Sequence, residues 1–193
     1  NLGGQELEVT TLFSDIRGFT SMSEKMSPKD VVDSLNEYFD KMIEVVFKHN
    51  GTLDKIIGDA LMVIYGAPIG SNNDAERALS TAIEMQQKLE ELNVVRMTRG
   101  QSPLEIGIGL NTGKAISGNI GSKVQMNYTV IGDAVNLASR LCSHAKSGEV
   151  VISKSVLDRL NDYEGFKEQI PIKVKGKSVT IGAITKHVEV ASS

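Results

Sequence analysis

The chain has 193 residues, of which 40% are hydrophobic, and this is enough to bury one core and form a single domain. The net charge is −3, so the chain has no excess of positive charge with which to bind nucleic acid or an anionic membrane, and we expect this domain to contact neither. The one cysteine, Cys142, excludes an internal disulfide and indicates a reducing compartment such as the cytoplasm. Because the sequence begins at Asn1 and not at Met, we interpret residues 1–193 as one domain excised from a larger protein, whose own location stays open.

The first predicted element is a strand at residues 7–15 that has a carboxylate on its apolar face. Asp15 shares the parity of the residues that form this face, which are Leu7, Val9, Thr11 and Phe13. A carboxylate on such a face is costly unless it is paired or holds a cation. Residues 16–20 contain a glycine and no proline, so their backbone N–H groups can curl around an anion. Together these features suit a metal triphosphate; the alternative is a strand that ends in an ordinary Asp-containing turn.

A long helix is predicted next, with Ser27 as its N-cap, Pro28 at its first position and an end at Asn50-Gly51. Its apolar residues recur at the helical period and are Val31, Leu35, Tyr38, Phe39, Met42, Ile43, Val46 and Phe47.

Residues 52–65 are predicted to form a hairpin with Gly58-Asp59 as its two-residue turn, because apolar and β-branched runs flank that dipeptide. The pairs on one face in this register are Ile57 with Ala60, Lys55 with Met62 and Leu53 with Ile64. Lys55 is then an ammonium among apolar neighbours. The alternatives are plain turn chemistry for Asp59 and a side chain that reaches water for Lys55.

The second half of the chain alternates between predicted helices and strands. We expect a helix at 74–92, a polar loop at 93–103, strands at 104–111 and 125–131, a helix at 133–146, a strand at 149–152, a short helix at 154–160 and strands at 166–175 and 178–188. Asp133 is the predicted N-cap of the helix at 133–146. Asn136 and Arg140 are four residues apart and therefore share one face of that helix, where an amide and a guanidinium can address a sugar and a phosphate. An ordinary solvated face is the alternative.

The order strand, helix, hairpin, helix, strand in the first part of the chain is the split βαβ arrangement. It predicts an α+β fold with a ferredoxin-like palm, a βαββαβ core, followed by additional C-terminal αβαββ elements.

Taken together, these segments resemble the catalytic domain of class III nucleotidyl cyclases, from about Glu8 to Val188. The segments that carry the resemblance are Phe13-Ser14-Asp15-Ile16-Arg17-Gly18-Phe19-Thr20, Gly58-Asp59-Ala60, the run from Tyr128 to Arg140, and Val174-Lys175-Gly176-Lys177. The subgroup it is most similar to is the cyanobacterial and soluble bicarbonate-responsive adenylyl cyclases. The resemblance implies conversion of ATP to 3′,5′-cyclic AMP and pyrophosphate in a head-to-tail homodimer whose two sites are shared between the chains.

The resemblance also implies a role for each matching residue. Two Mg²⁺ ions, for which Mn²⁺ can substitute, would be held by Asp15, Asp59 and the carbonyl of Ile16. The triphosphate would lie against Gly18, Phe19, Thr20 and Lys175, with Lys177 as the rival of Lys175. The base would be selected by Lys55 and Thr129, and the transition state would be stabilised by Asn136 and Arg140.

The choice of base can be argued from hydrogen-bonding groups. Adenine has an acceptor at N1 and a donor at N6, which suit the ammonium of Lys55 and the hydroxyl oxygen of Thr129. Guanine presents a donor at N1, which mismatches Lys55. This favours ATP. Thr129 stands where many other adenylyl cyclases have aspartate, and the resemblance associates this change with activation by bicarbonate.

One position departs from the family pattern, because Gly107 stands where many members have an arginine for the triphosphate. Lys114 or another basic residue would have to replace it. A guanylyl cyclase, a diguanylate cyclase and a catalytically silent dimerisation or nucleotide-sensing module are the competing functions. The diguanylate cyclase hairpin signature is absent, since the tip reads Ile57-Gly58-Asp59-Ala60.

Overall fold

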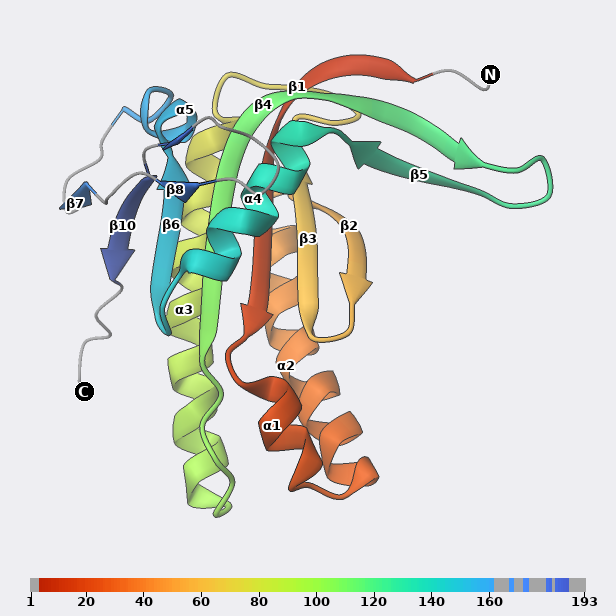
Figure 1. The fold of residues 1–193 in the computed structure, drawn as a ribbon. Helices are drawn as coiled ribbons and strands as arrows, with labels where there is room; N and C mark the ends of the chain where they lie inside the picture. Colours follow the sequence, from red (N-terminus) through yellow and green to blue (C-terminus); the bar gives the residue numbers. More distant parts are fainter. Residues whose placement is uncertain (1–3, 162–166, 169–171, 174–179, 182, 188–193) are drawn as a thin grey trace.

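The computed structural model describes residues 4–161, 167–168, 172–173, 180–181 and 183–187. These residues form a mixed α+β fold with helices on both faces of one sheet (Figure 1). The helices are α1 (Phe19–Glu24), α2 (Pro28–Lys48), α3 (Asp74–Thr98), α4 (Asp133–His144) and α5 (Lys154–Leu157). The strands are β1 (Gln5–Ile16), β2 (Thr52–Ile57), β3 (Ala60–Tyr65), β4 (Ile106–Gly121), β5 (Met126–Ile131), β6 (Glu149–Ser153), β7 (Lys167–Glu168), β8 (Ile172–Lys173), β9 (Thr180–Ile181) and β10 (Ala183–His187).

The main sheet has the strand order β2-β3-β1-β4-β6-β10-β7, and β5 pairs with β4 outside that path. Strand β1 is antiparallel to both β3 and β4, whereas β6 runs parallel to β4. The order β2-β3-β1-β4, with α2 and α3 as the connecting helices, is the predicted βαββαβ palm, so the predicted fold class is confirmed.

Helices α2 and α3 cover one face of the sheet and enclose the larger hydrophobic core (Figure 1). The predicted cap of α2 is present, because the hydroxyl of Ser27 accepts a hydrogen bond of 3.1 Å from the N–H of Asp30. The predicted apolar stripe is buried at Tyr38, Met42 and Val46, but the inclusion of Phe47 was wrong: it is 59% exposed at the last turn. Helix α4 crosses the opposite face, over β4 and β1.

Strand β4 is much longer than the predicted strand at 104–111. The Asn111-Thr112-Gly113 segment continues the strand because it pairs with β1, where the buried hydroxyls of Thr10 and Thr112 lie 2.7 Å apart. Beyond it, β4 and β5 leave the body of the molecule together as a long two-stranded arm (Figure 1). The arm exposes large apolar side chains, namely Ile116, Ile120, Val124, Met126, Tyr128 and Ile131.

Several boundaries also differ from the prediction. Helix α1 was not predicted, and α3 continues through most of the expected loop, where Asn93 and Arg96 are buried and hydrogen-bonded to backbone carbonyls at Leu104 and Ser102. Gly132 and not Asp133 is the N-cap of α4. The predicted strands at 166–175 and 178–188 lie partly outside the described residues. Among the described helices, none combines the length and the apolar character needed to cross a bilayer.

Candidate active site

Two carboxylates meet where β1 ends. Asp15 pairs in register with Gly107 of β4, and Asp59 lies in the tight turn between β2 and β3. The antiparallel pairing of β1 with β3 brings this turn beside the end of β1, so that a carboxylate oxygen of Asp59 accepts a 2.9 Å hydrogen bond from the N–H of Ile16. The structure therefore brings the three predicted metal-binding residues together.

Asp15 is partly buried and lies near a second carboxylate, that of Asp59. Its side chain is 36% exposed, and partial burial raises its pKa above the usual value, an effect that the nearby charge of Asp59 increases and Arg17 opposes. Within the described part of the chain, no group of three or more acidic, histidine or cysteine side chains gathers at one point. Two carboxylates and a backbone carbonyl form an all-oxygen donor set that fits Mg²⁺ when substrate phosphates supply the other ligands.

Arg17 is a site residue that the sequence analysis missed. Its guanidinium contacts the carboxylate of Asp15 and donates hydrogen bonds to the carbonyl oxygens of Cys142 at 2.7 Å and Ala145 at 2.9 Å. Arg17 therefore links the predicted metal-binding end of β1 to the C-terminal end of α4.

The position of Arg17 also explains the glycine at position 107. A Cβ atom on Gly107 would lie 2.6 Å from the guanidinium of Arg17, so a larger residue cannot stand there while Arg17 holds its place. Lys114, the one substitute that was named, lies seven residues further along β4, at roughly 3.3 Å per residue, and its ammonium is 3.6 Å from Glu6. The basic group beside Gly107 is thus Arg17 and not Lys114.

The two predicted base-selecting residues lie on neighbouring elements and share one partner. The hydroxyl of Thr129 on β5 donates a 2.9 Å hydrogen bond to a carboxylate oxygen of Asp54 on β2. The ammonium of Lys55 lies 3.5 Å from the same oxygen. Asp54 precedes Lys55 directly, but no pattern in the sequence marks it as a site residue.

Helix α4 presents the predicted transition-state residues to solvent. Val135, Ala138, Leu141 and Cys142 form its buried stripe, while Asn136 and Arg140 are exposed. A Cβ atom on Gly109 would lie 2.2 Å from the backbone nitrogen of Cys142, so glycine is required for α4 to lie this close to β4. Cys142 is buried, and burial raises the pKa of its thiol to about 12.

The predicted phosphate loop follows β1 directly. Gly18 adopts a left-handed conformation with φ of 66° and is the N-cap of α1. Phe19 and Thr20 are the first residues of this helix, so their N–H groups have no carbonyl partner within it. Lys175 and its rival Lys177 lie outside the described residues.

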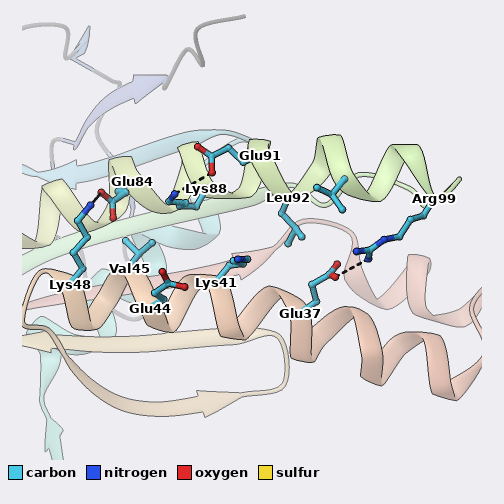
Figure 2. A pocket seen from close by; sticks show the side chains of 11 residues that line it. Glu37, Lys41, Glu44, Val45, Lys48, Glu84, Lys88, Glu91, Leu92 and Arg99 are labelled. Atoms are coloured by element: carbon cyan, nitrogen blue, oxygen red, sulfur yellow. Dashed lines mark hydrogen bonds and ion pairs between the residues drawn. The ribbon is translucent and has the colours of Figure 1, made fainter. Parts of the chain in front are cut away.

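A separate groove between α2 and α3 contains none of the predicted site residues (Figure 2). Its volume is about 540 Å³, and its charged side chains largely pair with one another. The pairs are Lys48 with Glu84 at 2.6 Å, Glu37 with Arg99 at 2.8 Å and Lys88 with Glu91 at 3.2 Å. We interpret this groove as a solvated polar surface of the two helices.

Within one chain, the predicted residues thus form three separate groups. The metal group is Asp15, Ile16 and Asp59; the base group is Lys55 and Thr129. Asn136 and Arg140 form the third group on α4, and neither side chain makes a hydrogen bond or ion pair with another residue of the described ranges.

Comparison with known proteins identifies the family to which such a site belongs. Residues 4–188 match the model of the adenylate and guanylate cyclase catalytic domain. The chain is 38% identical to an adenylate cyclase of Anabaena cylindrica over 182 residues, which are 90% of this chain and 35% of that protein. It spans between 26% and 35% of the length of this and similar curated relatives.

Two crystal structures have nearly the same fold. The adenylyl cyclase CyaB from P. aeruginosa is 38% identical, with a TM-score of 0.91 over 95% of each chain. A guanylyl cyclase is 39% identical, also with a TM-score of 0.91, over 95% of this chain and 93% of that one. Overall similarity in sequence and fold therefore does not distinguish an adenylyl cyclase from a guanylyl cyclase.

Proposed function

The chain belongs to the family of adenylate and guanylate cyclase catalytic domains, and from this premise we propose that it is an adenylyl cyclase that forms 3′,5′-cyclic AMP and pyrophosphate from ATP. The observation that carries the proposal is the pairing of Lys55 with Thr129 around one buried carboxylate. An ammonium and a hydroxyl oxygen offer a donor to N1 of adenine and an acceptor to its N6 amino group. The N1 donor of guanine would face an ammonium that can only donate.

The residues at the end of β1 would hold the metal ions and the triphosphate. Asp15, Asp59 and the Ile16 carbonyl supply oxygen ligands for two Mg²⁺ ions, for which Mn²⁺ can substitute. When bound, the ions lower the pKa of the ribose 3′-hydroxyl and neutralise triphosphate charge. The N–H groups of Gly18, Phe19 and Thr20 would donate hydrogen bonds to phosphate oxygens, with Lys175 as a further cation.

The residues on α4 would act on the reacting end of the nucleotide. Asn136 would hold the ribose so that its 3′-oxygen faces the α-phosphorus in line with the departing pyrophosphate. Arg140 would neutralise the charge that develops on the α-phosphate, an effect worth roughly 3–4 kcal/mol in comparable sites.

Two observations support a head-to-tail homodimer with composite sites. No hydrogen bond or ion pair joins the three groups of predicted residues within the described part of one chain. The arm of β4 and β5 also exposes apolar side chains, with Val124 97% and Met126 47% exposed. In the proposed dimer, Asp15 and Asp59 of one chain face Lys55, Thr129, Asn136, Arg140 and Lys175 of the other. A solitary chain would then be nearly inactive.

Guanylyl cyclase activity is the second candidate, because the similarity to a guanylyl cyclase structure equals the similarity to the adenylyl cyclase. Lys55 argues against it. A silent dimerisation or nucleotide-sensing module is disfavoured because every predicted metal and transition-state residue is present.

One assay separates these functions. The purified chain is supplied with ATP or GTP, each with Mg²⁺ or Mn²⁺, over a range of protein concentrations, and cyclic AMP and cyclic GMP are measured. We expect cyclic AMP as the main product and a specific activity that rises with protein concentration. A preference for GTP would identify a guanylyl cyclase, and the absence of both products would identify a silent module.

A further inference from the structure

A β-bulge in β2 directs Asp54 toward the base-selecting residues. The register of β2 on β3 shifts between Leu53 and Lys55, which pair with the consecutive residues Val63 and Met62. The predicted pairing of Leu53 with Ile64 was therefore wrong, and Asp54 is the extra residue of the bulge. In a regular strand, Asp54 and Lys55 would point to opposite faces. A bulge redirects side chains locally, which allows both to approach one point.

Asp54 is a buried carboxylate with specific partners. Its side chain is only 3% exposed, whereas that of Lys55 is 43% exposed. One carboxylate oxygen accepts the 2.9 Å hydrogen bond from Thr129 and lies 3.5 Å from the Lys55 ammonium. Burial of a carboxylate is costly unless such partners are present, so these contacts explain how it is accommodated.

We propose that Asp54 is a positioning residue for base recognition, an inference that rests on the proposed adenylyl cyclase function. An ionised carboxylate can only accept hydrogen bonds, so the Thr129 hydroxyl must use its single proton to donate to Asp54. The hydroxyl then offers only lone pairs to the nucleotide. It can accept from the N6 amino group of adenine, whereas the O6 acceptor of guanine would meet another acceptor.

The hydrogen bond to Asp54 fixes whether the Thr129 hydroxyl donates to the base or accepts from it. A freely rotating hydroxyl can donate or accept and would discriminate weakly between the two bases. Because the hydroxyl of Thr129 donates its proton to Asp54, it can only accept a hydrogen bond from the base. The same carboxylate holds Lys55 beside it as the donor. Asp54 thus defines the donor and acceptor pattern without contacting the base.

The test compares ATP and GTP as substrates of the full chain carrying Asp54→Ala. We expect the ratio of kcat/KM for ATP to that for GTP to fall about 3- to 10-fold, the range given by one net hydrogen bond. Most of the change should be in KM for ATP and not in kcat, because base binding is shared by the ground state and the transition state. Asp54→Asn should recover most of the ratio, since its amide oxygen can occupy the acceptor position.

Two controls separate positioning from a structural role. Asp33→Ala removes a carboxylate that pairs with Lys29 on the exposed surface of α2, and it should leave the ratio unchanged. In a Thr129→Val background, Asp54→Ala should change the ratio less than in the unmutated chain, because the two residues act as one unit. Equal losses of kcat/KM for both nucleotides, or a ratio in Asp54→Asn as low as in Asp54→Ala, would overturn the proposal.

A second measurement needs no variant and applies even if Asp54→Ala does not fold. Purine riboside triphosphate keeps the N1 acceptor but lacks the N6 amino group. We expect its kcat/KM to be about 3- to 10-fold below that of ATP, because the Thr129 acceptor loses its donor. Equal values would overturn the inference. Failure of the chain to prefer ATP over GTP would instead contradict the proposed function itself.

Discussion

The two faces of the sheet differ in what their residues do. On the face covered by α2 and α3, side chains such as Met42, Met85 and Leu12 are completely buried in one continuous apolar cluster. On the face crossed by α4, the apolar clusters are small, and charged residues such as Asp15 and Arg17 remain partly exposed. The residues that stabilise the fold are therefore largely distinct from those proposed to carry out the chemistry. Substitutions on one face should change folding, and those on the other should change turnover.

The largest effect on activity is expected from Asp15→Asn. Loss of this carboxylate removes a proposed metal ligand, so cyclic AMP formation should fall to background in the purified variant. Asp59→Asn should do the same and is preferable to Asp59→Ala, because an amide oxygen can still accept from the N–H of Ile16. Full activity in either variant would contradict the two-metal site.

The same Asp15→Asn variant should be at least as stable as the unmutated chain when metal is absent. Burial raises the pKa of Asp15, so the folded state binds its proton more tightly than the unfolded state does. The ionised carboxylate therefore destabilises the fold above its ordinary pKa of 3.8, and the cost grows until the pH passes the raised value. Thermal melts in EDTA at pH 7 and pH 3.5 measure this cost. The Tm of the variant relative to that of the unmutated chain should be higher at pH 7 than at pH 3.5. A lower Tm at pH 7 would show that Asp15 stabilises the fold.

Arg140→Ala should reduce kcat by about 10²–10³-fold and leave stability almost unchanged. Its side chain is exposed on α4 and makes no hydrogen bond or ion pair within the described ranges, so folding does not depend on it. Steady-state kinetics and a thermal melt on one preparation test both parts. A large loss of Tm, or an effect confined to KM, would argue against a transition-state role.

Met42→Ala, on the face covered by α2 and α3, should reduce stability and leave turnover almost unchanged. Its fully buried side chain lies in the α2–α3 core, and its loss should lower the free energy of unfolding by about 2–5 kcal/mol. The kcat of the folded fraction should stay close to that of the unmutated chain. Urea unfolding combined with activity below the transition measures the two effects separately; an intact stability with reduced kcat would contradict the division between the faces.

The smallest effect is expected from bicarbonate. If a small anion binds near the active-site cations and prefers the closed dimer, it should activate modestly at constant pH and ionic strength. Lys55 and Lys175 are the cations we expect to be involved. Chloride at the same concentration is the control, because screening alone alters triphosphate binding. Equal responses to the two salts would remove this prediction and leave the cyclase assignment intact.

The sequence predicts those features that depend on local pattern. The palm, the cap of α2 and the pairing of Lys55 with Met62 follow from periodicity and turn chemistry, and the structure confirms them. Asp54 and Arg17 were missed because their roles depend on partners far along the chain, Thr129 for one and the end of α4 for the other. A β-bulge and a guanidinium contact between distant segments produce no periodic pattern in the sequence. Gly107 was the one indication that another side chain fills the space beside β4.

The composite site is tested most directly by mixing two inactive chains. Asp15→Asn chains and Arg140→Ala chains, carrying different tags, are unfolded together, refolded and purified as heterodimers. Each heterodimer should contain one site with every group intact, and an equal mixture before purification should recover about a quarter of the unmutated activity, given random pairing. Mixing Asp15→Asn with Asp59→Asn is the matched control, because each site then lacks one carboxylate. We predict rescue in the first mixture and none in the second; verified heterodimers without rescue in the first would contradict a catalytic site shared between two chains.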